Sequence, residues 1–140
     1  MNKQDSTPNA SLAIDGAIAT ITLDQPSKHH AFDDKLIATL LSYLDQLRSK
    51  PEVRVLKLEA TGKHFCAGAD LNWMKRMAKM TYDANREDSQ QLAKLFKELK
   101  NFPLPTVVRV QGAAFGGAIG LIACCDIAIA ADNARFCLSE

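Results

Sequence analysis

The sequence predicts an α/β fold in which strands and helices alternate and the sheet is substantially buried. Short segments rich in Val, Ile and Leu recur along the chain as expected of strands, and longer segments with apolar residues at helical spacing lie between them. Glycines mark several of the boundaries between these segments. With 140 residues, of which 47% are hydrophobic, the chain is long enough to form a core, and we expect residues 1–140 to be one domain.

The start of the chain is expected to form a hairpin followed by a helix. Residues 11–15 and 17–23 are β-rich and flank an Asp15-Gly16 pair, which is a strong signal for a turn between two antiparallel strands. Residues 33–50 follow, with acids in the first turn and bases in the last turn, which suits the helix dipole. The apolar stripe of this helix comprises Leu36, Leu40, Leu44 and Leu47.

The middle of the chain alternates once more between strand and helix. Residues 53–60 are expected to be a strand that runs into a glycine-containing loop, after which Asp70 is placed to cap a short helix over residues 71–80. A second long helix is expected over residues 84–102, before the Pro-Leu-Pro of residues 103–105. Its predicted buried face comprises Leu92, Leu95, Phe96 and Leu99.

The last part of the chain is expected to continue the alternation with shorter elements. The expected elements are a strand over 106–110, a helix that starts at Gly116 and Gly117 and runs to about Cys125, and strands over 126–131 and 134–140.

Composition and charge exclude several classes of partner. Seventeen basic and sixteen acidic residues leave a net charge of +1 without a block of one sign, so neither nucleic acid nor a membrane surface is implied as a partner. No apolar run is long enough for a signal peptide or a membrane span, and we expect a cytoplasmic protein. The four cysteines form no CxxC pair, and the adjacent Cys124 and Cys125 have no histidine at ligand spacing, so no metal site is expected and buried free thiols are the simplest interpretation.

Two glycine-containing loops are the features most suggestive of chemistry. The sequence FCAGADL follows the strand at 53–60, and GAAFGGAIG follows the strand at 106–110. Each loop can leave amide groups unpaired at the start of a helix, and two such amides that converge form an oxyanion hole. The alternative is that the glycines only allow close packing of helix on strand. Neither loop matches a phosphate-binding motif.

Three segments, in this order and at these separations, resemble the enoyl-CoA hydratase/isomerase (crotonase) superfamily. They are ITLDQPSKHHAFDDKL (21–36), KHFCAGADLNWM (63–74) and VQGAAFGGAIGLIACCDIAIAADNARFCLSE (110–140). The resemblance implies a crotonase-like ββα spiral, related to the ClpP fold, and covers the chain from about Ser11 to Glu140. The last segment is most similar to the branch of bacterial methylglutaconyl-CoA hydratases, which act on carboxylated branched enoyl-CoAs in leucine breakdown.

The resemblance also implies a set of site residues. In this family the thioester carbonyl accepts hydrogen bonds from two backbone amides, which fall here on Ala69 and Gly117, and a carboxylate corresponding to Glu140 moves a proton. No metal or redox cofactor is implied, and coenzyme A enters only as part of the acyl-CoA substrate. The expected contacts with coenzyme A are Lys28, Ala31, Ala67, Gly68, Asp70, Leu71 and Gly116.

The sequence departs from the family pattern in two respects. Two-glutamate hydratases carry a first carboxylate at the position of Gly120, so Glu140 is the one carboxylate of the pair that is present. The missing carboxylate argues against simple two-carboxylate hydration and keeps isomerisation or another enolate reaction open beside hydration by a single carboxylate. Full-length relatives also continue into a C-terminal helical region and form homotrimers or hexamers. We therefore expect the N-terminal part of a spiral core, with apolar surface uncovered and a tendency to associate.

Other interpretations of the same residues stay open. A non-catalytic fragment that binds acyl-CoA would keep the two loops and lack turnover. A serine protease on the related spiral would need a histidine partner for Ser139, and none is evident. His29, His30 and His64 are expected to be solvated loop residues, with contact to a CoA phosphate or a substrate carboxylate as the alternative. Residues 73–80 can line an acyl pocket or simply pack.

Overall fold

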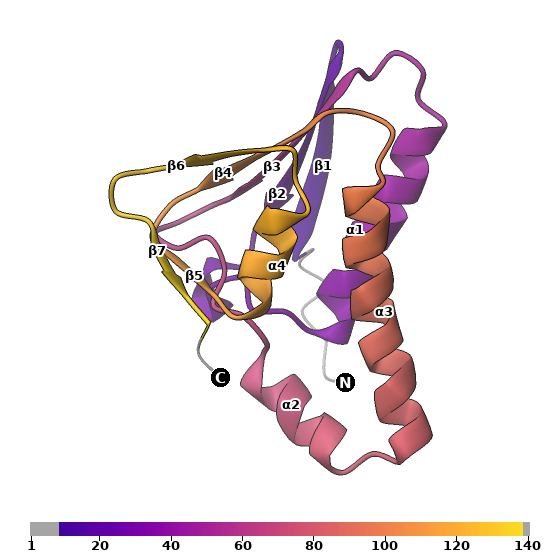
Figure 1. Cartoon of the computed structure of the whole chain (residues 1–140), viewed down its shortest axis with the longest axis vertical. Coiled ribbons are helices and arrows are strands. Elements are labelled where there is room, and N and C mark those ends of the chain that lie inside the picture. The colour runs from indigo at the N-terminus through magenta and orange to yellow at the C-terminus, as the bar shows by residue number, and fades with distance from the viewer. Residues whose placement is uncertain (1–8, 139–140) are drawn as a thin grey trace, which may run out of the picture.

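Strands and helices alternate along residues 9–138, the part of the chain that the computed structural model describes (Figure 1). The order of elements is the predicted one, with one short strand added. The strands are β1 (Ala10–Asp15), β2 (Ile18–Leu23), β3 (Val55–Ala60), β4 (Thr106–Val110), β5 (Ala113–Phe115), β6 (Ile127–Ala130) and β7 (Arg135–Cys137). The helices are α1 (Asp34–Arg48), α2 (Leu71–Ala78), α3 (Tyr82–Lys100) and α4 (Gly117–Ala123), and a short 3-10 helix, η1 (Pro26–Lys28), precedes α1.

A five-stranded sheet in the order β1-β2-β3-β4-β6 forms the body of the fold. β1 and β2 pair antiparallel across the turn at Asp15-Gly16, as predicted, and Gly16 has a φ of 57° there. β2, β3, β4 and β6 pair in parallel, so each connection between them must cross over the sheet. The parallel strands therefore end at one common edge of the sheet, where the loops that follow β3 and β4 begin.

Helices α1 and α3 lie side by side and contact each other, and together with α4 they meet the central strands (Figure 1). The predicted stripe of α1 is buried, as Leu36, Leu40, Leu44 and Leu47 are at most 3% exposed. The hollow left between these helices and the sheet measures about 10 Å³ and has only apolar walls, so it offers no partners for a water molecule and the core is closely packed. Its walls are Ile21, Leu40, Leu44, Leu56, Leu58, Leu95, Leu99 and Leu121.

Side-chain caps determine where two of the helices begin. The Asp33 carboxylate accepts a hydrogen bond from the amide of Leu36 at 2.8 Å, which starts α1 as predicted. Helix α3 begins at Tyr82, before the predicted start at residue 84, because the Thr81 hydroxyl accepts from the amide of Ala84 at 3.2 Å. Across residues 9–138, no helix combines the length and the hydropathy that crossing a bilayer requires.

Strand β5 was not predicted as a strand. Ala113–Phe115 pairs in parallel with β7 and forms a second, two-stranded sheet. It is too short, and too uniformly apolar, to show the alternation that identifies a strand in sequence. Its pairing matters for the site, because the same three residues also contact the loop that follows β3.

The prediction of a substantially buried sheet is wrong at β6. This strand lies at the edge of the sheet, and all four of its residues are exposed within the described part of the chain. The exposed side chains include Ile127 and Ile129, and Phe136 of β7 is exposed as well. The expectation of uncovered apolar surface is therefore confirmed, whereas association of the chain remains a prediction.

We expect the core strand β3 to dominate stability. Leu56 is 1% exposed at the centre of the core, and replacing it by alanine should lower the free energy of unfolding by about 2–5 kcal/mol, because the transfer energy is lost and a cavity remains. The same substitution at Leu71, which is 72% exposed, is the matched control and should change it by less than about 0.5 kcal/mol. Urea unfolding followed by circular dichroism measures both, and equal losses would contradict the assignment of the core.

Candidate active site

The loops that follow β3 and β4 run side by side at the edge of the sheet. Cys66 and Ala114 form a parallel bridge, in which the Cys66 amide donates to the Ala113 carbonyl at 3.1 Å and the Phe115 amide donates to the Cys66 carbonyl at 3.1 Å. These bonds hold the segment 66–70 against the segment 113–117. Beyond this bridge the two segments approach each other at Gly68 and Gly116, and Ala69 and Gly117 are the residues that directly follow.

Glycine is required where the two loops approach most closely. Gly68 has a φ of 90°, and a Cβ atom placed on it would lie 2.9 Å from the carbonyl oxygen of Phe115. A Cβ atom on Gly116, which has a φ of 55°, would lie 4.0 Å from the Cα atom of Gly68. These two glycines therefore allow the loops to contact each other. The predicted approach of a thioester oxygen to Gly116 and Gly117 stays a prediction.

The amide of Ala69 is left without an acceptor by its pairing with Phe32. The Phe32 amide donates to the Gly68 carbonyl at 2.7 Å, and the Asp70 amide donates to the Phe32 carbonyl at 2.6 Å. Ala69 lies between Gly68 and Asp70, the two residues that bond to Phe32. In a parallel bridge the amide of this middle residue points away from the partner segment. Within residues 9–138 the Ala69 amide meets no acceptor. The expectation that a helix start frees this amide is wrong, since α2 begins two residues later.

The amide of Gly117 is free because it opens a helix. Gly117 is the first residue of α4, so its N–H has no partner within the helix, and none of the described residues accepts from it. The preceding amide, of Gly116, donates instead to the Cys137 carbonyl at 2.8 Å. A Cβ atom on Gly117 would lie 3.5 Å from the ring of Phe32. Phe32 thus pairs with Ala69 through its backbone and places its ring beside Gly117, although no local pattern in the sequence marks it as a site residue.

A pocket of about 500 Å³ opens beside Ala69, between α2 and α3. Most of its wall is apolar, as expected of a site for an acyl chain. Leu92 and Phe96, which were predicted to be buried, are half-buried because they line it. Its lining residues are Ala69, Trp73, Met74, Met77, Ser89, Leu92, Ala93 and Phe96.

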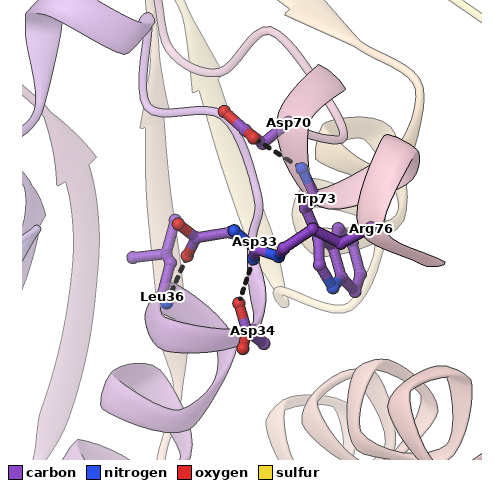
Figure 2. Close-up of polar contacts among 6 residues, drawn as sticks. All are labelled: Asp33, Asp34, Leu36, Asp70, Trp73 and Arg76. Atoms are coloured by element: carbon purple, nitrogen blue, oxygen red, sulfur yellow. Dashed lines mark hydrogen bonds and ion pairs between the residues drawn. The ribbon is translucent and has the colours of Figure 1, made fainter. Parts of the chain in front are cut away.

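Asp70 serves as a helix cap. Its carboxylate accepts from the amide of Trp73 at 2.9 Å, as predicted, and this contact begins α2 (Figure 2). On the next turn, Arg76 pairs with Asp34 of α1 at 2.9 Å, and both side chains are 53% exposed. Such an exposed pair stabilises by at most about 1 kcal/mol. Figure 2 shows how the two contacts tie α2 to the loop before it and to α1.

The residues expected to contact coenzyme A lie along two adjoining segments. The Ala67 amide donates to the His29 carbonyl at 2.9 Å, which brings residues 28–32 against the loop at 66–70. On these segments Lys28, Ala67 and Leu71 are exposed, Ala31 and Asp70 are half-buried, and Gly68 is buried; Gly116, on the other loop, is half-buried. Glu140, the expected proton carrier, lies outside the described residues.

His30 does not behave as the predicted solvated histidine. It is 2% exposed, and burial lowers the pKa of its imidazole below the ordinary value. His29 is exposed and His64 is half-buried. Their rings pack edge to face, with 5.3 Å between the ring centroids. The low exposure of His30 comes from tertiary packing against Thr61, which the local sequence does not reveal.

Cys66 is a buried thiol and the other cysteines are less enclosed. Burial raises the pKa of the Cys66 thiol to about 11, so it stays protonated, and it donates to the His30 carbonyl at 3.1 Å. The prediction of buried free thiols is correct for Cys66 but wrong for Cys137, which is exposed. Among residues 9–138 no cluster of three or more His, Cys, Asp or Glu is arranged to hold a metal ion.

Gly120 faces an aromatic ring. A Cβ atom on Gly120 would lie 3.0 Å from two ring atoms of Phe96, which is closer than a side chain normally packs. A carboxylate at this position would therefore need Phe96 to move. Phe96, a residue of the pocket wall, therefore lies next to the position at which two-glutamate relatives were expected to carry their first carboxylate.

Gly68→Ala should separate the two loops, and Gly16→Ala is its matched control. Both glycines have positive φ, but a Cβ atom at Gly16 meets nothing within 4 Å, whereas one at Gly68 meets the Phe115 carbonyl. The Gly68 variant should therefore shift the amide resonances of Ala69 and Gly117 and unfold at lower urea, beyond the cost of positive φ seen at Gly16. Two-dimensional NMR of both variants measures this, and equal effects would show that the loops do not touch there.

Comparisons of the sequence and of the fold with known proteins point to the same family. The family model described as enoyl-CoA hydratase/isomerase matches residues 13–140. The fold is similar to the crystal structure of an enoyl-CoA hydratase from Shewanella pealeana ATCC 700345, with a TM-score of 0.92 and 48% identity, covering 94% of this chain and 50% of that one. The sequence is 34% identical over 132 residues to the hydroxycinnamoyl-CoA hydratase-lyase of Pseudomonas fluorescens, covering 91% of this chain and 47% of that protein.

A human relative extends the comparison beyond bacteria. The sequence is 35% identical over 127 residues to the human enoyl-CoA hydratase domain-containing protein 2, mitochondrial, covering 90% of this chain and 42% of that protein. The chain spans about half the length of the curated relatives it matches. The predicted crotonase-like α/β fold is confirmed. The chain belongs to the enoyl-CoA hydratase/isomerase family.

Proposed function

We propose that this chain carries the oxyanion hole of an acyl-CoA hydratase, formed by the backbone amides of Ala69 and Gly117. One observation carries the proposal. Two amides without acceptors among residues 9–138 stand at corresponding positions of two adjoining loops, and an apolar pocket of about 500 Å³ opens beside one of them. Fixed backbone donors of this kind stabilise an oxygen that gains negative charge, since they need no rearrangement during the reaction.

The proposed chemistry is the addition of water to an enoyl thioester. The thioester oxygen accepts from both amides, which draws electrons from the conjugated double bond and makes its β-carbon electrophilic. Water adds its oxygen to that carbon and gives up a proton, and the resulting enolate takes a proton at the α-carbon. Glu140 is the proposed carrier for these protons. No redox cofactor is proposed, because the addition of water transfers no electrons to another molecule. No metal is proposed either, because the two amides polarise the thioester and a base moves the protons.

The proposed path of the substrate follows the two segments that meet at the site. The acyl chain enters the pocket between α2 and α3, with Met74 and Met77 able to adapt to its shape. Coenzyme A lies along Lys28 and Ala31 on one side and along residues 67–71 and Gly116 on the other. Lys28 is exposed, so its ammonium group is free to meet a phosphate.

The proposed substrate is a carboxylated, branched enoyl-CoA. The support is the similarity of residues 110–140 to the methylglutaconyl-CoA hydratase branch, together with the lack of a first carboxylate at Gly120, where a side chain would need the Phe96 ring to move. The same observation favours a second candidate, an enoyl-CoA isomerase, because a single carboxylate can move one proton between two carbons. The whole protein is proposed to be a cytoplasmic homotrimer or hexamer with a role in leucine or fatty acid breakdown.

The decisive experiment replaces Gly117 by proline and by alanine. Proline is favoured at the first position of a helix and replaces the amide proton by a ring carbon, whereas alanine keeps the proton and adds the same Cβ atom. With crotonyl-CoA as the probe, the proline variant should lose about 100- to 1,000-fold in turnover and the alanine variant should keep most of it. The loss of ultraviolet absorbance of the conjugated double bond measures hydration.

Three outcomes separate the candidate functions. Hydration that depends on the Gly117 amide supports the hydratase, and conversion of a 3-enoyl-CoA to the conjugated isomer without hydration supports the isomerase. Binding of crotonyl-CoA without either reaction supports a non-catalytic acyl-CoA-binding role. Absence of binding by calorimetry, or equal turnover of the proline and alanine variants, contradicts the oxyanion hole.

A further inference from the structure

His30 is a buried side chain whose two ring nitrogens are both engaged by backbone groups. Nδ1 accepts from the amide of Gln25 at 2.9 Å, and Nε2 lies 2.6 Å from the carbonyl oxygen of Thr61. Because the amide can only donate and the carbonyl can only accept, Nδ1 must be bare and Nε2 must carry the proton. Only the neutral imidazole, in this one tautomer, fits both partners.

The backbone around His30 adopts a conformation that needs support. His29 and His30 both have positive φ, of 49° and 54°, a region that residues other than glycine adopt at an energetic cost. Two such residues in succession persist only where surrounding contacts hold them. The two bonds of the imidazole supply such contacts, since the bond to Gln25 closes the turn and the bond to Thr61 joins the turn to the residue after β3.

The same turn directs its backbone toward the loop that carries Ala69. The His29 carbonyl accepts from the Ala67 amide at 2.9 Å, and the His30 carbonyl accepts from the Cys66 thiol at 3.1 Å. Two residues further on, Phe32 forms the bridge that leaves the Ala69 amide without an acceptor. The loop at 66–70 is therefore attached to residues 29–32 along its whole length.

We propose that His30 is a positioning residue, whose neutral imidazole locks the left-handed turn at residues 29–30 and thereby orients the Ala69 amide. The inference rests on the proposed function for the role of that amide, and it assigns no contact between His30 and the substrate. Protonation of Nδ1 would place its N–H opposite the Gln25 N–H. Two donors repel each other, so the hydrogen bond that closes the turn would be lost. His30 therefore also makes the geometry of the site sensitive to acid.

The charged groups near His30 shift its pKa in opposite directions. The Asp24 carboxylate, which accepts from the Thr61 hydroxyl at 3.0 Å, favours protonation, and His29, in contact with His64, disfavours it. Burial is the largest influence and lowers the pKa of His30 below 6.5. The folded chain therefore holds the neutral form at neutral pH and loses it only as pH falls below 6.5, through the lowered pKa.

The test reads the polarisation of a bound thioester carbonyl. Butyryl-CoA, labelled with ¹³C at that carbonyl, binds without reacting, and hydrogen bonds from the site lower its infrared stretching frequency. His30→Leu removes both ring contacts at similar volume. His30→Asn is the matched variant, because asparagine tolerates positive φ and places an acceptor oxygen where Nδ1 lies, but does not titrate. It leaves Asp24, His29 and His64 unchanged.

We expect the full 140-residue chain to lower the carbonyl frequency at pH 7 and to lose this effect as pH falls below 6.5. His30→Asn should keep the effect across the same range. His30→Leu should lose most of it and should turn over crotonyl-CoA about 100-fold more slowly, with a smaller change in KM. A His30→Leu variant that folds and polarises the carbonyl like the unaltered chain would overturn the proposal, as would a pH dependence retained by His30→Asn.

A second measurement separates this inference from the proposed function. If the unaltered chain does not polarise the carbonyl, the oxyanion hole is contradicted. The structural claim is then decided by amide hydrogen exchange at Gly68, which donates to the Cys66 sulfur, and at Asp70, which donates to the Phe32 carbonyl. Faster exchange in His30→Leu than in His30→Asn supports the positioning role, and equal exchange overturns it. If His30→Leu does not fold, the proposal is decided by the carbonyl frequency of the unaltered chain and of His30→Asn, measured as a function of pH.

Discussion

The backbone pairing of Cys66 with Ala114 is the contact on which the candidate site depends. β3 and β4 are neighbours in a parallel sheet, so their loops leave the sheet at the same edge, but adjacency alone does not bring two particular amides together. The bridge sets the register of one loop on the other, and Gly68 permits the close contact that follows. Phe32 then packs against both loops, with its backbone at Ala69 and its ring near Gly117.

Elements whose signals are local could be predicted from the sequence, and contacts between distant segments could not. The leucine stripe of α1 and the capping role of Asp70 depend on residues within one or two helical turns, and both are found as expected. The free amide of Ala69 depends on pairing with Phe32, and the burial of His30 depends on Thr61. Neither partner can be chosen from spacing along the chain, which is why Phe32 was not selected and His30 was expected to be solvated.

The pattern of apolar residues also has a limit that α3 illustrates. Its stripe predicted one buried face, yet only Leu95 and Leu99 are fully enclosed, while Leu92 and Phe96 line the pocket next to α2. Periodicity shows which side of a helix is apolar. It does not distinguish a packed core from a ligand pocket, because both are lined by apolar side chains. The exposed side chains of β6 show the same ambiguity, because an apolar strand reads alike whether or not another element covers it.

The use of main-chain donors in the proposed hole separates the chemistry of the site from its selectivity. Amides are present at every residue except proline, so most substitutions at Ala69 would leave the donor itself in place, provided that the backbone keeps its path. The walls of the pocket, by contrast, are side chains of α2 and α3, including Trp73, Met77 and Phe96. During evolution, substitutions in α2 and α3 would therefore change which acyl groups fit the pocket, while the two backbone amides that polarise the thioester stay the same.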